Sequence, residues 1–95
     1  MSVLLLVEDD SAVLQPLTTF LADNGFRIKT AEGIREAISA WTSEVDLIVT
    51  DWNLPDGVGL DLIREGLRRQ STIPVLLLTS RQAVEDKILG LELGA

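Results

Sequence analysis

Short runs of apolar residues recur along the chain and are separated by longer stretches with a helical period. The continuous runs cover residues 3–7, 47–49 and 75–78, whereas residues 26–31 alternate between apolar and polar positions. A continuous run is typical of a strand covered on both faces, as in a parallel sheet, and alternation indicates a strand at a sheet edge. We therefore predict a strand over each of these ranges.

The stretches between the runs predict helices, because their apolar residues return every three or four positions. The stripes are Val13, Leu14, Leu17 and Leu21; Ile34, Ala37, Ile38 and Trp41; Leu60, Ile63 and Leu67; and Val84, Ile88 and Leu91. We expect Trp41, at the end of its stripe, in the core. Pro16 lies inside the first stripe, so that helix is expected to be kinked or to begin late.

Strands and helices that alternate in this order predict an α/β layered fold with right-handed crossovers. A chain of 95 residues is long enough for one domain. In open sheets of this class, ligands bind outside the carboxyl ends of the strands. The residues that directly follow each apolar run are therefore the first candidates for ligand-binding or catalytic residues.

The amino-acid composition excludes several kinds of catalytic and binding site. The chain has no Cys and no His, which excludes disulfides, thiolate or histidine zinc sites, and histidine acid–base catalysis. Its formal net charge of −7 disfavours direct binding to nucleic acid or to an anionic membrane surface. The apolar N-terminal run is too short for a signal peptide or a membrane span, so we expect a cytoplasmic protein.

Acidic and hydroxyl residues follow the predicted strands. Glu8, Asp9 and Asp10 follow the first run, Asp51 follows the run at 47–49, and Thr79 with Ser80 follows the last. One interpretation is structural, with Asp10 or Ser11 capping the next helix. The other is functional: clustered carboxylates repel one another unless they share a cation, and Mg²⁺ is the first candidate for an all-oxygen site. A carboxylate beside Mg²⁺ is a competent nucleophile towards a phosphoryl group.

Three segments resemble the receiver domain of bacterial two-component response regulators: residues 3–10, 46–57 and 73–80. The closing segment, 84–95, is similar to receivers of the winged-helix transcription-factor class. The resemblance spans the whole chain. It implies a flavodoxin-like, doubly wound parallel sheet with strand order 2-1-3-4.

The resemblance also implies roles for individual residues. Asp51 matches the phospho-acceptor, and Thr79 matches the switch hydroxyl that moves towards the phosphoryl group. Glu8, Asp9, Asp51 and the backbone carbonyl of Asn53 match the Mg²⁺ ligands. The phosphoryl donor would be a sensor histidine kinase or a phosphotransfer protein, and phosphorylation would switch an interaction surface rather than turn over a separate substrate. A C-terminal DNA-binding output domain outside this chain is a further implied partner.

The family continues after Gly94-Ala95 with a fifth strand, a lysine that pairs with the phosphoryl group, and a fifth helix. We therefore expect residues 1–95 to form a receiver domain that ends before the fifth strand. Such an ending would leave the first helix stripe and the strand at 75–78 uncovered. Those surfaces would favour a homodimer or a swapped dimer.

Other functions stay open at this point. A receiver-like interaction module that never accepts phosphate would share the fold. A Mg²⁺-dependent aspartyl-phosphate phosphatase would also use Asp51, but that class needs a second Asp two residues later, where this chain has Asn53. A flavodoxin-like binder of a phosphorylated cofactor would need a loop rich in Gly, Ser or Thr after the first strand, where Glu8 and Asp9 stand instead.

Overall fold

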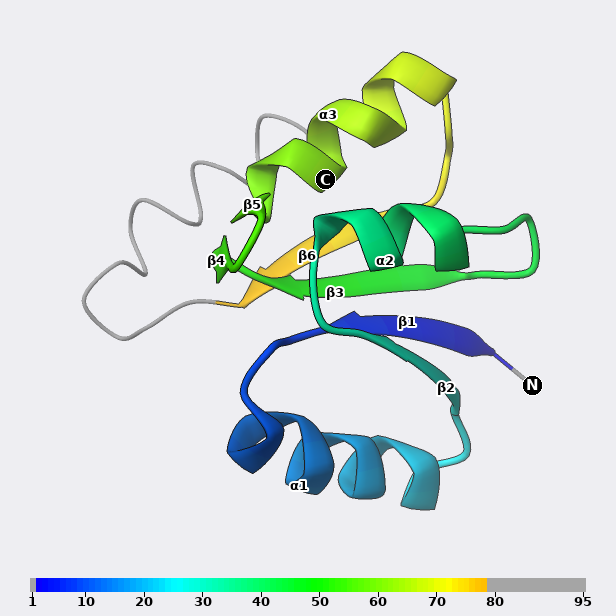
Figure 1. Cartoon of the computed structure of the whole chain (residues 1–95). Helices are drawn as coiled ribbons and strands as arrows, with labels where there is room; N and C mark the ends of the chain where they lie inside the picture. The colour runs from blue at the N-terminus through cyan, green and yellow to red at the C-terminus, as the bar shows by residue number, and fades with distance from the viewer. Residues whose placement is uncertain (1, 79–95) are drawn as a thin grey trace.

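The computed structural model describes residues 2–78 as strands joined by helices and one short hairpin (Figure 1). The elements are β1 (Val3–Val7), α1 (Ser11–Asp23), β2 (Arg27–Ala31), α2 (Ile34–Ala40), β3 (Leu47–Asp51), β4 (Asn53–Leu54), β5 (Gly57–Val58), α3 (Leu60–Arg69) and β6 (Val75–Leu78). The predicted last helix, Thr79 and Ser80 lie outside the described residues. Across residues 2–78, no helix combines the length and apolar character needed to cross a membrane.

The main sheet is parallel, with the order β2-β1-β3-β6. This confirms the predicted order 2-1-3-4, because β6 is the fourth long strand along the chain. In the central pair, Val7 of β1 lies beside Thr50 of β3. The two strands therefore end level with each other, and the residues that follow them emerge at one edge of the sheet.

Helices cover the two faces of the sheet unequally. Side chains of β1 alternate between the faces: Leu5 and Val7 join the core below α2 and α3, whereas Leu4 and Leu6 pack with the leucines of α1. Figure 1 shows α1 on one side of the sheet and α2 with α3 on the other. All five residues of β1 are buried, as a continuous apolar run predicts for a central strand.

Two predicted helix stripes were partly wrong. Leu67 is 62% exposed, and the buried face of α3 consists of Leu62, Ile63 and Gly66 instead. The reason is the large ring of Trp41, which lies where a Cβ on Gly66 would come within 3.1 Å of its Cη2. The prediction that Trp41 belongs to the core is confirmed. On α1, Val13 is 43% exposed and only Leu14, Leu17 and Leu21 pack against the sheet.

The first helix begins at Ser11 and contains Pro16, so of the two predicted consequences of Pro16, a kink or a late start, the late start was wrong. Asp10 is its N-cap: the Asp10 side chain accepts a hydrogen bond of 2.9 Å from the backbone N–H of Ala12. The Asp10 carbonyl also accepts from Leu14 N at 2.9 Å. These bonds secure the first turn ahead of Pro16, where one backbone donor is missing.

Candidate metal centre

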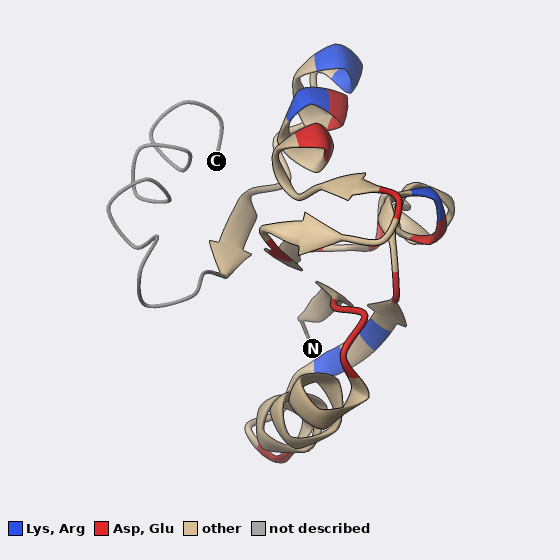
Figure 2. Cartoon of the chain, turned by 60° about the vertical axis from the view of Figure 1, so that its left-hand side comes forward, with Lys and Arg blue, Asp and Glu red and all other residues tan. Residues whose placement is uncertain are grey.

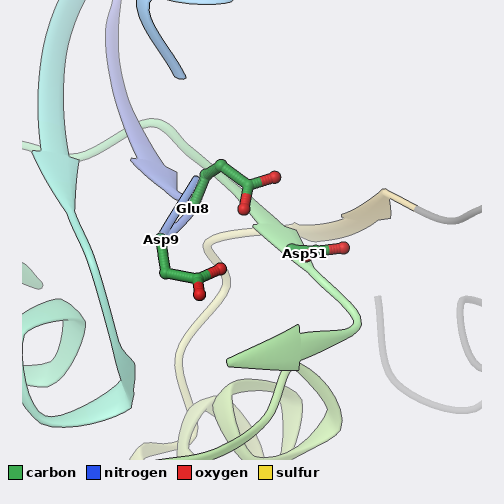
Figure 3. A group of neighbouring side chains, drawn as sticks. All are labelled: Glu8, Asp9 and Asp51. Carbon is green, nitrogen blue, oxygen red and sulfur yellow. The ribbon is translucent and has the colours of Figure 1, made fainter. Parts of the chain in front are cut away.

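Three acidic side chains meet at the carboxyl edge of the sheet. Glu8 and Asp9 directly follow β1, and Asp51 is the last residue of β3. One carboxylate oxygen of each residue lies within 4.8 Å of the others (Figure 3). The parallel register of β1 and β3 causes this convergence, because residues that follow level strand ends are neighbours in space.

The Glu8 carboxylate is the most enclosed of the three. Glu8 is only 5% exposed, its backbone N–H donates to the Ala31 carbonyl at 2.9 Å, and Asp10 N donates to its Oε2 at 3.2 Å. Burial raises the pKa of Glu8, and the negative charges of Asp51 and Asp9 raise it further, against the lowering effect of the Asp10 amide. The cluster is therefore repulsive by itself and would be stabilised by a shared cation.

Asp10 has a different role from its neighbours. Its side chain lies at the edge of the same cavity but accepts the capping hydrogen bond from Ala12 N. The structural interpretation of the acidic run is thus correct for Asp10, whereas Glu8 and Asp9 join Asp51 as candidate ligands. Within residues 8–10, Asp10 is therefore a helix cap, and Glu8 and Asp9 are candidate metal ligands.

The acidic cluster opens into a cavity of about 770 Å³. Its lining combines Glu8, Asp9, Asp10, Val13, Leu17, Asp51, Asn53 and Leu78. One part of the lining is acidic and the other is an apolar wall formed by α1 and the end of β6. The space is large enough for a hydrated ion together with a phosphoryl group.

The segment after Asp51 is held by hydrogen bonds at both of its ends. Trp52 N donates to Asp51 Oδ1 at 2.8 Å, which orients the carboxylate, and Gly59 N donates to the Trp52 carbonyl at 2.6 Å. A Cβ on Gly59 would clash with the backbone carbonyl oxygen of Asp51. Gly59 is therefore a residue that the site needs and that sequence reasoning missed. Its position just before a predicted helix was the only available signal.

The predicted site residues are found as follows. The structure brings Glu8, Asp9 and Asp51 together, and it places Asn53 at the start of β4 in the cavity lining. Trp52, which follows Asp51, is half-buried and packs against the core below α2 and α3. Thr79 lies outside the described residues.

The donor set fits a hard divalent cation. Carboxylate oxygens supplied by three residues match the preference of Mg²⁺ for charged oxygen ligands. A softer metal would require sulfur or imidazole ligands, and the chain contains neither Cys nor His.

Comparison with known proteins agrees with this geometry. The response regulator receiver domain family matches residues 4–95. The KDP operon transcriptional regulatory protein KdpE of Escherichia coli is 42% identical over 96 residues, and the match covers 100% of this chain but 42% of that protein. The chain thus spans about two fifths of the length of the curated relatives it matches.

Solved structures show the same fold. The receiver domain of HemR from Leptospira biflexa has a TM-score of 0.88 and 34% identity, with 100% of this chain and 77% of that chain covered. The response regulator TrrA of Thermotoga maritima, solved in complex with Mg²⁺-BeF, has a TM-score of 0.80 and 27% identity, with 90% and 76% covered. From the family match, the sheet order and the acidic edge together, the chain belongs to the response regulator receiver domain family.

Proposed function

We propose that Asp51 accepts a phosphoryl group from a phosphohistidine of a partner kinase or phosphotransfer protein, and that Glu8, Asp9, Asp51 and the Asn53 carbonyl hold Mg²⁺ for this reaction. The observation that carries the proposal is the meeting of the Glu8, Asp9 and Asp51 oxygens within 4.8 Å. Such a cluster is costly without a cation. The Mg²⁺-BeF complex of the related TrrA supports the choice of ion.

The chain's own residues would orient the nucleophile. Because Trp52 N holds Asp51 Oδ1 at 2.8 Å, Oδ2 is the oxygen left to attack phosphorus. The bond from Asp51 Oδ2 to phosphorus forms while the bond from phosphorus to the histidine nitrogen breaks, and the imidazole leaves with the bonding electron pair. When bound, Mg²⁺ supplies positive charge that offsets the repulsion between the carboxylates and the incoming phosphoryl oxygens.

Phosphorylation would then act as a signal rather than as a step in turnover. It adds charge at the end of β3 and so biases the surrounding surface between two states. The names of the relatives, which are transcriptional regulatory proteins, support an output domain that binds DNA in the complete protein. A phosphatase function is less well supported, because Asn53 cannot serve as the acid–base that such enzymes use.

The proposal is tested by treating this chain with acetyl phosphate and Mg²⁺ and measuring the intact mass. The wild type should gain one phosphoryl group, and Asp51→Asn should gain none. Asp10→Asn is the matched control: it removes a carboxylate from the same cavity but keeps a good helix cap, so it should be phosphorylated like the wild type.

Two results would refute the assignment. A phosphoryl group on Asp51→Asn would show that another residue is the acceptor. No gain on wild type with a stable fold would support the alternative of an interaction module that never accepts phosphate.

A further inference from the structure

Helix α2 is capped by a residue from a distant segment. Its N-cap, Gly33, has no side chain to accept from the first turn. Asp56 replaces that side chain: its Oδ1 accepts from Ile34 N at 2.7 Å and its Oδ2 accepts from Arg35 N at 3.0 Å. Both bonds lower the pKa of Asp56, so the carboxylate is charged at neutral pH.

Gly33 leaves the space that this contact needs. A Cβ at position 33 would come within 2.7 Å of Asp56 Oδ1. Any larger residue there would push the carboxylate away from the helix. The contact between Asp56 and α2 thus depends on residues in two segments, Gly33 and Asp56.

Asp56 lies in the turn of the hairpin that also carries Asn53. In this hairpin Asn53 pairs with Val58 and Leu54 pairs with Gly57, so Asp56 sits between the two short strands. Leu54 is buried in the core. A movement of the turn would therefore be transmitted through one pair of strands to the peptide group of Asn53.

The hairpin is held from two sides. On the side of α3, Val58 N donates to Asp61 Oδ2 at 3.1 Å. On the side of α2, Ile34 N and Arg35 N donate to Asp56 in the turn. Loss of the Asp56 contacts would weaken the second of these attachments and leave the hairpin held mainly by α3 and the core.

We propose that Asp56 is a positioning residue that fixes the hairpin to α2 and thereby holds the Asn53 carbonyl towards Glu8, Asp9 and Asp51. Mg²⁺ binding and the order of the first turn of α2 are then coupled, and the coupling is reciprocal. The inference rests on the proposed function, since it requires the Asn53 carbonyl to be a metal ligand. It adds that Mg²⁺ binding would affect α2 through the hairpin of β4 and β5.

The first test is a Mg²⁺ titration measured by isothermal titration calorimetry, because fluorescence would report Trp41 as well as Trp52. Asp56→Ala should weaken Mg²⁺ binding by roughly tenfold, as loss of an outer-shell support does elsewhere. Gly33→Ala should weaken it in the same direction without any change of charge. Asp56→Asn keeps a side-chain acceptor and should recover part of the affinity.

Glu36→Gln is the matched charge control. Glu36 lies in the first turn of α2 and accepts from Glu32 N at 3.0 Å, so the variant removes one negative charge nearby and leaves the Ile34 and Arg35 bonds to Asp56 in place. It should bind Mg²⁺ nearly as the wild type does. If Glu36→Gln weakens binding as much as Asp56→Ala, the effect is electrostatic and the positioning role is wrong.

The second test needs no variant. In the wild type, Mg²⁺ should slow hydrogen exchange at the amides of Ile34 and Arg35, because the coupling is reciprocal. Unchanged exchange at these amides under saturating Mg²⁺ would overturn the inference. A wild type that fails to bind Mg²⁺ at all would instead refute the proposed metal site. Tight binding that is lost in Asp9→Asn but kept in Asp56→Ala and Gly33→Ala would refute only the role of Asp56.

Discussion

The acidic edge of the sheet and the outer face of α3 both concentrate charge, but they treat a glutamate in opposite ways. On α3, Glu65 Oε2 lies 2.6 Å from both Arg68 Nη2 and Arg69 Nε. These arginines lower the pKa of Glu65 to about 2. At the sheet edge, burial and the neighbouring carboxylates raise the pKa of Glu8.

The difference separates charges that are paired within the fold from charges that are unpaired within residues 2–78 and lie at the sheet edge, where we propose that a metal ion binds. Arg69 completes its interactions within the protein: its guanidinium lies 4.8 Å from the centroid of the Trp41 ring, and its Nη1 donates to the Trp41 carbonyl at 3.3 Å. Figure 2 shows Lys and Arg on α3, on α2 and on β2, and Asp and Glu in the segment that follows β1. Within residues 2–78, no Lys or Arg forms an ion pair with Glu8, Asp9 or Asp51.

The largest expected effect is the response of stability to Mg²⁺. Binding to the folded state should raise the free energy of unfolding, by about 2.7 kcal/mol when free Mg²⁺ is about a hundred times its dissociation constant. Asp9→Asn should abolish this gain because it removes a ligand. In a chelator, the same variant should be at least as stable as the wild type, since it also relieves repulsion. Thermal melts with and without Mg²⁺ measure both effects.

The control for this experiment is NaCl at equal ionic strength, which screens the acidic charges without binding the site. A Mg²⁺ gain that NaCl reproduces would mean screening rather than binding. A full Mg²⁺ gain in Asp9→Asn would show that the cluster at the sheet edge is not the metal site.

A smaller effect is expected from pH. The pKa of Glu8 is raised in the folded protein, so the folded state binds a proton more tightly than the unfolded chain. The stability contributed by Glu8 is therefore present below the ordinary glutamate pKa of 4.5 and is lost as pH rises through its folded value. Urea unfolding in a chelator over this range should show Glu8→Gln gaining stability relative to the wild type as pH rises. A constant difference between the two proteins would contradict the raised pKa.

The sequence was sufficient to predict the sheet order and the meeting of Glu8, Asp9 and Asp51. The strands and their ends follow from local pattern, because a continuous apolar run marks a central strand and its last residue marks the sheet edge. The order of the strands came from the resemblance to receiver domains. The hairpin of β4 and β5 was not predicted, since strands of two residues have no periodicity to detect.

Contacts between segments that are far apart in the chain could not be predicted from the sequence either. Asp56 caps a helix that begins 22 positions earlier in the chain, and Gly59 is required because the Asp51 carbonyl oxygen and Leu77 Cδ2 lie beside it. The prediction that Leu67 belongs to the buried face of α3 was wrong for the same reason. Gly66 becomes part of the buried face because a Trp ring from another segment packs over it.

The smallest expected effect concerns Glu65. Its folded pKa of about 2 lies below the ordinary value of 4.5, so its contribution to stability is present above pH 4.5 and is lost as pH falls towards 2. Glu65→Gln should therefore lower stability slightly at neutral pH, by less than the Mg²⁺-linked gain, because the Arg68 side chain is 71% exposed and water screens its ion pair with Glu65. High salt should shrink this loss. Glu65→Gln should also keep the full Mg²⁺ gain, since its charge is neutralised within α3. A variant on α3 that changed the Mg²⁺ gain would show that the two charged regions are coupled, and that pairing does not separate structural from functional charge in this protein.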